Sequence, residues 1–158
     1  MIKIWGRPNS SNVQKVLWAA DEIGVKYERT DAGGAFGIVK EPKYLAMNPN
    51  GLIPTIEDGD LILWESNTIV RYLAAKYGKG TLGIEDPGKR ASAEKWMDWG
   101  FTLGVPNGPL FWGYVRTPPD QRDPAALEAS RVRAIELWTI VDRQLANQPY
   151  IAGKDFTV

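Results

Sequence analysis

Apolar residues follow two different periods along the first part of the chain. The apolar run from Ile2 to Trp5 predicts a short strand, and the next apolar positions are three or four residues apart, which predicts a helix. That helix has Val13, Val16, Leu17, Ala20 and Ile23 as its apolar positions, Ser11 or Asn12 as its cap and Gly24 as its stop. Alternation from Val25 to Thr30 predicts a second strand. Strand, helix and strand in this order predict a βαβ unit with parallel strands.

A second group of elements follows a loose, glycine-containing stretch with a short helix expected near Pro42 to Ala46. Pro54 to Glu57 and Leu61 to Trp64 flank Asp58-Gly59-Asp60, which predicts a β-hairpin. Helical spacing then resumes, with Gly78 as the stop. A βαβ unit followed by ββα is the arrangement of a thioredoxin-like domain, and we place this α/β domain at residues 1–78.

The second half of the chain has only helical periodicity. We expect an all-α domain over residues 87–158, with its helices interrupted at Pro106, at Pro109 and at Thr117-Pro118-Pro119-Asp120. Asp123-Pro124 is expected to cap and begin a late helix. Two faces are predicted to be apolar: Ala93, Trp96, Met97 and Gly100 on one helix, and Leu127, Ala134, Trp138, Val141 and Leu145 on another.

The composition limits the binding partners and the catalytic groups that the chain can have. The 158 residues include 19 basic and 19 acidic ones but neither His nor Cys. Balanced charge without a basic run gives no support for a nucleic-acid or membrane partner, and the N-terminus predicts a strand rather than a signal peptide, so we expect a cytoplasmic protein. The absence of His and Cys removes the usual catalytic triads, thiolate nucleophiles and zinc ligands, and we expect no metal. Any nucleophile must therefore come from a ligand.

Two motifs predict a site for a small peptide. In Ile53-Pro54, Pro54 has no N–H to donate and holds Ile53 extended; with a cis bond between them, the Ile53 backbone could pair with an extended ligand. Ser66 lies where the strand Leu61 to Trp64 gives way to a helix, whose N-terminus favours an anion. The simpler alternative for Ser66 is a helix cap.

The loop from Arg7 to Asn12 adds candidate catalytic residues. It lies at the carboxyl end of the first strand, where open α/β sheets bind ligands. A hydroxyl here cannot act as a base, but it can donate a hydrogen bond to a thiolate and, with the helix dipole, lower a thiol pKa from about 8.5 toward neutrality. The alternative is that Ser10, Ser11 and Asn12 only cap the helix and form its turn.

Over its whole length the chain resembles a cytosolic glutathione transferase of the theta-like or phi-like kind. The likeness rests on an aliphatic residue before Pro54, on Glu65-Ser66 and on the late segment from Tyr150 to Thr157. It implies a catalytic Ser in the first loop. Ser10 fits best, with Ser11 as its rival and Asn12 as an alternative.

The resemblance also implies a binding role for each motif. Ile53, before Pro54, would pair with the cysteinyl backbone of glutathione, Glu65 would bind its γ-glutamyl ammonium group and Ser66 the γ-glutamyl carboxylate. Lys40 matches a position that reaches the glycyl carboxylate. Val39 and Leu52 depart from the polar residues common in the family, which predicts a less firmly held glycyl end. A small electrophile is the implied second substrate, and a homodimer the implied assembly.

Six aromatic or apolar residues are candidates for the electrophile pocket, although most are expected in the core: Trp96, Trp99, Leu103, Phe111, Trp112 and Tyr114. Thr157 resembles the first residue of a capping box. We therefore expect either a fragment or a member lacking its terminal helices, with exposed apolar surface and either reduced stability or compensating association.

The leading hypothesis is a detoxifying transferase that adds the glutathione thiolate to an electrophile. Peroxidase, dehalogenase, isomerase and disulfide-reductase activities belong to the same family. Two further hypotheses are a non-catalytic glutathione-binding or ligand-storage module and a protein-interaction domain.

Overall fold

The computed structural model describes all of residues 1–158, and they form two compact units. The first comprises residues 1–86 together with 157–158, and the second comprises residues 87–156. The first contains a four-stranded sheet and three α-helices, whereas the second is helical apart from its last turns. The expected order, an α/β thioredoxin-like part followed by an all-α part, is confirmed.

The sheet of the first unit has the strand order β2-β1-β3-β4. Its strands are β1 (Ile2–Trp5), β2 (Tyr27–Thr30), β3 (Thr55–Asp58) and β4 (Leu61–Trp64). β1 and β2 are parallel, as the βαβ pattern predicts, and β3 pairs antiparallel with both β1 and β4. β2 begins two residues later than predicted, because the Val25 amide instead donates to the Ala20 carbonyl and closes the helix end at Gly24.

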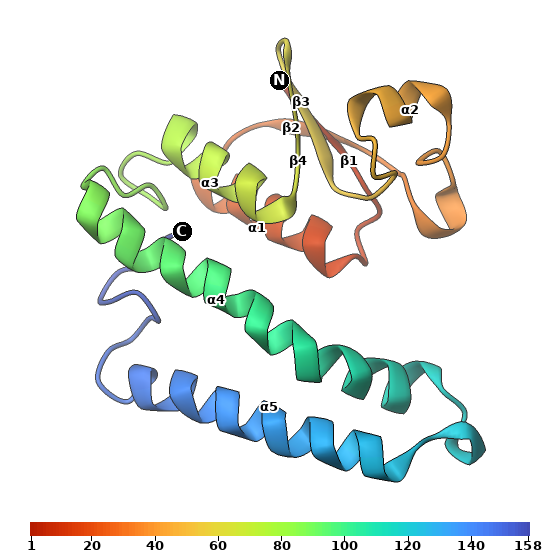
Figure 1. Cartoon of the computed structure of the whole chain (residues 1–158). Helices are drawn as coiled ribbons and strands as arrows, with labels where there is room; N and C mark the ends of the chain where they lie inside the picture. The colour runs from red at the N-terminus through yellow and green to blue at the C-terminus, as the bar shows by residue number, and fades with distance from the viewer. The chain divides into compact units, whose positions relative to one another are not determined.

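Two helices supply most of the apolar surface that buries the sheet. α1 (Ser11–Ile23) and α3 (Ser66–Tyr77) lie side by side, while α2 (Pro42–Met47) lies apart from them (Figure 1). Most buried apolar residues of this unit come from β1, β3, α1 and α3 at the positions that the periodicity predicts, including Ile4, Val13, Val16, Ala20, Ile56, Ile69 and Leu73. The core therefore fixes the start of α1 and the start of α3 on one scaffold.

A partly buried carboxylate joins the β3–β4 hairpin to the end of α3. Asp58 accepts hydrogen bonds from Tyr72 Oη at 2.6 Å, from Tyr77 Oη at 2.7 Å and from Lys76 Nζ at 2.8 Å. Burial by itself would raise the pKa of Asp58, but the bonds from Lys76 and the two tyrosines outweigh it and lower the pKa to about 2. The cluster holds α3 against the hairpin that leads into it.

Replacing Asp58 by Ala is expected to lower the free energy of unfolding by about 2 kcal/mol, because three donors lose a charged acceptor. Since the folded pKa lies below the ordinary value of 3.8, the wild-type carboxylate contributes fully above that value, and its contribution is lost as the pH falls toward 2. Urea unfolding at neutral pH and along an acid series measures both effects. Asp60→Ala, in the same turn, is the matched control and should change stability little.

The second unit is a helical hairpin. α4 (Pro87–Phe111) continues into a π-helical turn (Trp112–Arg116), a 3-10 turn follows at Pro119–Gln121, and α5 (Pro124–Leu145) runs back antiparallel to α4 (Figure 1). As predicted, Asp123 caps α5: its carboxylate accepts from the Ala126 amide at 3.0 Å.

The prediction that Pro106 and Pro109 interrupt the helix is wrong, because α4 continues through both. A helix-interior proline costs about 3 kcal/mol, which tertiary packing must offset. Pro106 is buried, and Gly113 in the π-helical turn packs so closely on Leu127 that a Cβ at Gly113 would clash with the Leu127 Cδ2. Packing of this segment on α5 therefore keeps the chain helical.

The aromatic residues of the second unit are less buried than the sequence predicts. Phe111, Trp112 and Tyr114 are exposed, and Trp96, Trp99 and Leu103 are only partly buried, so the expectation that most of these six are core is wrong. On α5, Leu127 and Ala134 are buried as predicted, but Trp138 and Leu145 are exposed and Leu137 is buried instead. None of the helices has an apolar stretch long enough to span a membrane.

Candidate functional site

Strand register brings three of the predicted motifs to one edge of the sheet. Trp5, the last residue of β1, pairs with Thr55, the first residue of β3, and Thr55 pairs in turn with Trp64, the last residue of β4. The loop after β1, the segment before β3 and the turn after β4 therefore leave the sheet side by side. These segments carry Ser10, Ile53-Pro54 and Glu65-Ser66 respectively.

The loop after β1 turns tightly into α1. A Cβ at Gly6 would lie 2.5 Å from the Val13 Cγ2, so the chain can pass this close to α1 only with glycine at this position. The Ser10 amide then donates to the Arg7 carbonyl at 3.3 Å, and Ser10 is the N-cap of α1 with extended backbone angles. The expectation of Ser11 or Asn12 as the cap is wrong by one or two residues.

The Ser10 hydroxyl is not used to cap the helix. Its side chain makes no capping hydrogen bond, although Ser is a preferred N-cap residue for that bond. Nor does the first turn of α1 contain an acidic residue that would neutralise the positive end of the helix dipole. Ser10 thus places a hydroxyl donor, without a capping bond, at an N-terminus that favours negative charge.

The turn after β4 has an unusual backbone at Glu65. Glu65 is the N-cap of α3 and has φ of 71°, a left-handed conformation that non-glycine residues adopt rarely and at a cost of about 1–3 kcal/mol. Ser66 is the first residue of α3 and is buried, and the first turn of α3 contains no acidic residue. Strained backbone of this kind clusters at ligand-binding sites.

Two hydrogen bonds tie the starts of α1 and α3 together. Ser66 Oγ donates to Asn12 Oδ1 at 3.3 Å, and Lys15 Nζ donates to Asn67 Oδ1 at 2.8 Å. Burial lowers the pKa of Lys15, and the nearby charge of Glu65 opposes that shift. The Asn12 side-chain oxygen thus accepts from Ser66, and a cation from α1 lies within the electrostatic reach of Glu65.

A buried polar network holds the segment before β3. The Leu52 carbonyl accepts from Tyr44 Oη at 2.7 Å and from Asn48 Nδ2 at 2.9 Å, and both donor groups also lie within hydrogen-bond distance of Thr55 Oγ1. Tyr44, Asn48 and Thr55 are almost completely buried. The Ile53–Pro54 peptide bond between these anchors is cis, as the sequence predicts. The Leu52 side chain, in contrast, is exposed.

Lys40 lies close to the same segment. A Cβ at Gly51 would lie 2.9 Å from Lys40 Nζ and equally far from the Val39 carbonyl, so Lys40 reaches the turn just before Leu52. The chain thus places the Lys40 cation beside the cis peptide segment, whereas the Glu65-Ser66 motif carries a carboxylate.

Sequence reasoning missed the residues that support the motifs. Lys15 and Asn67, like Asn12 and Ser66, are more than fifty positions apart in the chain, and no periodicity links them. The sole sequence signal for the network under Leu52 is that Tyr44, Asn48 and Thr55 are polar residues close to Ile53-Pro54 in the chain. Their convergence depends on the packing of α2 and the loop after it.

Comparison with known proteins agrees with this architecture. Residues 1–75 match the family described as glutathione S-transferase, N-terminal domain. The chain is 50% identical to glutathione S-transferase GstB of Escherichia coli K12, over 100% of this chain and 77% of that protein. It is 32% identical to glutathione S-transferase 3 of Zea mays, over 99% of this chain and 72% of that protein.

A solved structure shows the same relationship. The theta class glutathione S-transferase of Xanthomonas axonopodis pv. citri, crystallised with glutathione bound, superposes with a TM-score of 0.91 at 50% identity, covering 99% of this chain and 75% of that one. Identity of this level over the whole chain, together with the shared fold, confirms the resemblance that the motifs indicate. The chain belongs to the glutathione S-transferase family.

Proposed function

We propose that this chain binds glutathione at the edge of the sheet where β1, β3 and β4 meet the two helix N-termini, and activates its thiol as a thiolate that attacks a small electrophile. The observation that carries the proposal is the pairing of Trp5, Thr55 and Trp64 in one row. That row supports the proposal because the three segments that leave it carry a hydroxyl donor, an extended backbone and an acid beside a helix N-terminus. Glutathione needs all three.

The charges of the site match those of the tripeptide. Glutathione carries one ammonium group, two carboxylates and a thiol. In the proposed pose the ammonium group binds Glu65, the γ-glutamyl carboxylate lies at Ser66 on the N-terminus of α3, and the glycyl carboxylate faces Lys40. The backbone of Ile53, held between the anchored Leu52 carbonyl and β3, pairs with the cysteinyl residue.

The chemical step uses the ligand's sulfur, since the chain contains neither Cys nor His. In the proposed mechanism the Ser10 hydroxyl donates a hydrogen bond to the sulfur, and the positive end of the α1 dipole adds to the stabilisation of its negative charge. The thiol proton leaves to solvent. The thiolate then forms a bond to the electrophilic carbon, whose leaving group departs with the electrons of the broken bond.

Three further features belong to the proposal. We expect the protein to act as a homodimer, to work in the cytoplasm and to serve in detoxification, as the resemblance implies. The electrophile remains a class, small and reactive toward thiolates, because the aromatic residues considered for its pocket are exposed or only partly buried.

Thermal melting with and without glutathione tests the binding half of the proposal. A ligand at a hundred times its Kd is expected to add about 2.7 kcal/mol to the free energy of unfolding and to raise Tm accordingly. A tripeptide of the same composition with an α-glutamyl linkage is the matched control, because it presents the ammonium group and carboxylate in a different arrangement. It should give a clearly smaller shift.

The outcomes separate the competing functions. No shift with glutathione would exclude both a transferase and a glutathione-binding module, and would favour an interaction domain. A shift without turnover of any electrophile would favour the non-catalytic module. Equal shifts with the two tripeptides would contradict the roles given to Glu65 and Ser66.

A further inference from the structure

Two polar residues of α1, one helical turn apart, reach across to the start of α3. Asn12 and Lys15 are three positions apart and so lie on one side of α1, and α1 and α3 lie side by side (Figure 1). Their partners are consecutive residues of α3: Asn12 Oδ1 accepts from Ser66 Oγ, and Lys15 Nζ donates to Asn67 Oδ1 at 2.8 Å. Ser66 belongs to the proposed glutathione site, whereas Lys15 and Asn67 belong to none of its motifs.

Glu65, just before these two residues of α3, has a strained backbone and a carboxylate that does not cap the helix. Its φ of 71° lies in the left-handed region, which the surrounding structure must enforce in a non-glycine residue. The Ile69 amide donates to the Glu65 carbonyl at 2.9 Å, so the backbone is held by α3 itself. The carboxylate makes no capping hydrogen bond. The helix cap therefore does not fix the orientation of this side chain.

Lys15 supplies a charge that acts on this carboxylate. Burial lowers the pKa of Lys15, and the charge of Glu65 opposes that shift, so the two groups are close enough to attract each other. The hydrogen bond to Asn67 meanwhile fixes the position of the Lys15 ammonium group. The attraction therefore draws the Glu65 carboxylate toward α1, the helix whose N-cap is Ser10.

A cation beside Glu65 can help the ligand's own cation to bind. A carboxylate has two oxygens with about four acceptor positions, so it can attract Lys15 on one side and the γ-glutamyl ammonium group on the other. Because Lys15 is tied to Asn67, it is held outside the place that the ligand takes. A side chain oriented before binding loses less conformational entropy when the ligand arrives, which strengthens binding.

We propose that Lys15 is a positioning residue of the glutathione site: it holds the start of α3 through Asn67 and orients the Glu65 carboxylate toward the ammonium group of the ligand. This role rests on the proposed function and adds a residue outside the three motifs. Lys15 has no contact with the thiol in the proposed pose. It therefore acts on the Kd for glutathione and leaves kcat at saturating glutathione unchanged.

Titration calorimetry of the full chain with glutathione tests this role, alongside steady-state kinetics. Lys15→Gln is expected to raise the Kd about three- to tenfold with kcat retained, because the charge that orients Glu65 is lost. Lys15→Arg keeps the cation and is expected to bind nearly as tightly as the wild type. Lys79→Gln, which loses only a salt bridge between largely exposed side chains, is the matched control and should leave the Kd unchanged.

Two couplings show whether Lys15 acts through Glu65. On a Glu65→Gln background, Lys15→Gln is expected to have no further effect on the Kd, because the effects of residues that act through one another are not additive. The second coupling uses a glutathione analogue with hydrogen in place of the γ-glutamyl amino group. Since this analogue brings no cation to Glu65, Lys15→Gln should leave its Kd unchanged.

The outcomes separate this role from the function on which it rests, and circular dichroism with melting confirms that each variant is folded. A wild-type chain that does not bind glutathione would overturn the proposed function and the role of Lys15 with it. Wild-type binding with an unchanged Kd in Lys15→Gln would overturn the role of Lys15 alone. A loss of affinity that is equal for glutathione and the analogue, or that persists on the Glu65→Gln background, would overturn it too, because Lys15 would then not act through Glu65.

Discussion

Replacing Ser10 by Ala is expected to lower kcat with glutathione and a reactive electrophile about a hundredfold, while changing the Kd for glutathione little. In other enzymes, removing one hydrogen-bond donor that stabilises negative charge in the active site lowers kcat by roughly this factor. The structure supports Ser10 because its side chain makes no capping bond at the N-terminus of α1. Steady-state kinetics together with calorimetric binding measures the two quantities separately.

Ser11→Ala and Asn12→Ala are the comparison variants. Ser11 is exposed in the first turn of α1, and the Asn12 side chain is engaged by Ser66, so neither is expected to match the loss at Ser10. Asn12→Ala should weaken binding modestly, since it removes the acceptor of the Ser66 hydroxyl. A loss of kcat confined to Ser11→Ala or to Asn12→Ala would transfer the catalytic role to that residue.

Replacing Glu65 by Gln is expected to raise the Kd for glutathione by about ten- to a hundredfold, with kcat at saturating glutathione largely retained. The change keeps the size of the side chain but removes the charge opposite the ammonium group, and a hydrogen bond to a charged group contributes about 1.5–3 kcal/mol. Titration calorimetry measures the affinity, and kinetics at high glutathione measures the turnover.

Glu85→Gln is the matched control for Glu65→Gln. Glu85 pairs with Lys79 on the surface of the same unit, and both side chains are largely exposed, so its loss should leave the Kd unchanged. An unchanged Kd in Glu65→Gln would contradict the ammonium assignment. In the same series, Ser66→Ala should weaken binding; lost turnover with unchanged binding would contradict the role given to Ser66.

The fold of the first unit could be predicted well because local signals agree with it. Apolar alternation, the glycine stops and the Asp58-Gly59-Asp60 turn all indicate the elements that form. In the second unit, local signals and packing disagree. Pro106 and Pro109 indicate a break, but burial of Pro106 and the contact of Gly113 with Leu127 keep the helix continuous.

The motifs of the candidate site could be predicted from the sequence, but the contacts that hold them in place could not. Ser10, Ile53-Pro54 and Glu65-Ser66 lie at element boundaries, where turn and cap chemistry is visible in the sequence. The positive φ of Glu65 depends on the geometry of the β4–α3 turn, and the bond from Lys15 to Asn67 depends on how α1 packs on α3. Neither has a local signature.

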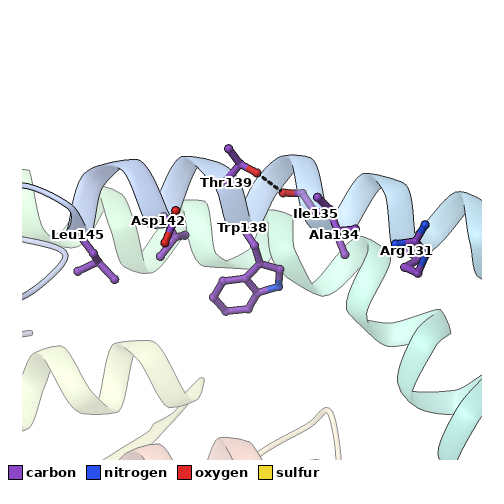
Figure 2. Close-up of a pocket in the computed structure, with 8 residues that line it drawn as sticks. Arg131, Ala134, Ile135, Trp138, Thr139, Asp142 and Leu145 are labelled. Carbon is purple, nitrogen blue, oxygen red and sulfur yellow. Dashed lines mark hydrogen bonds between the residues drawn. The ribbon is translucent and has the colours of Figure 1, made fainter.

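The exposed side of α5 shows another limit of prediction from apolar periodicity. Helical spacing indicates that Leu127, Ala134, Trp138 and Leu145 are apolar positions, but it does not say which of them the partner helix covers. In the structure α5 packs on α4, with Leu127, Ala134 and Leu137 buried and Trp138 and Leu145 exposed (Figure 2). α5 therefore carries more apolar residues than the structure buries on it.

The pKa of the thiol of bound glutathione tests the central claim most directly. The thiolate absorbs in the ultraviolet, so a pH titration of the complex reports its ionisation without any electrophile. We predict a pKa at least one unit below the value of about 8.5 for a free thiol, and a return toward that value in Ser10→Ala. A bound thiol that titrates like free glutathione in the wild-type protein would contradict the account.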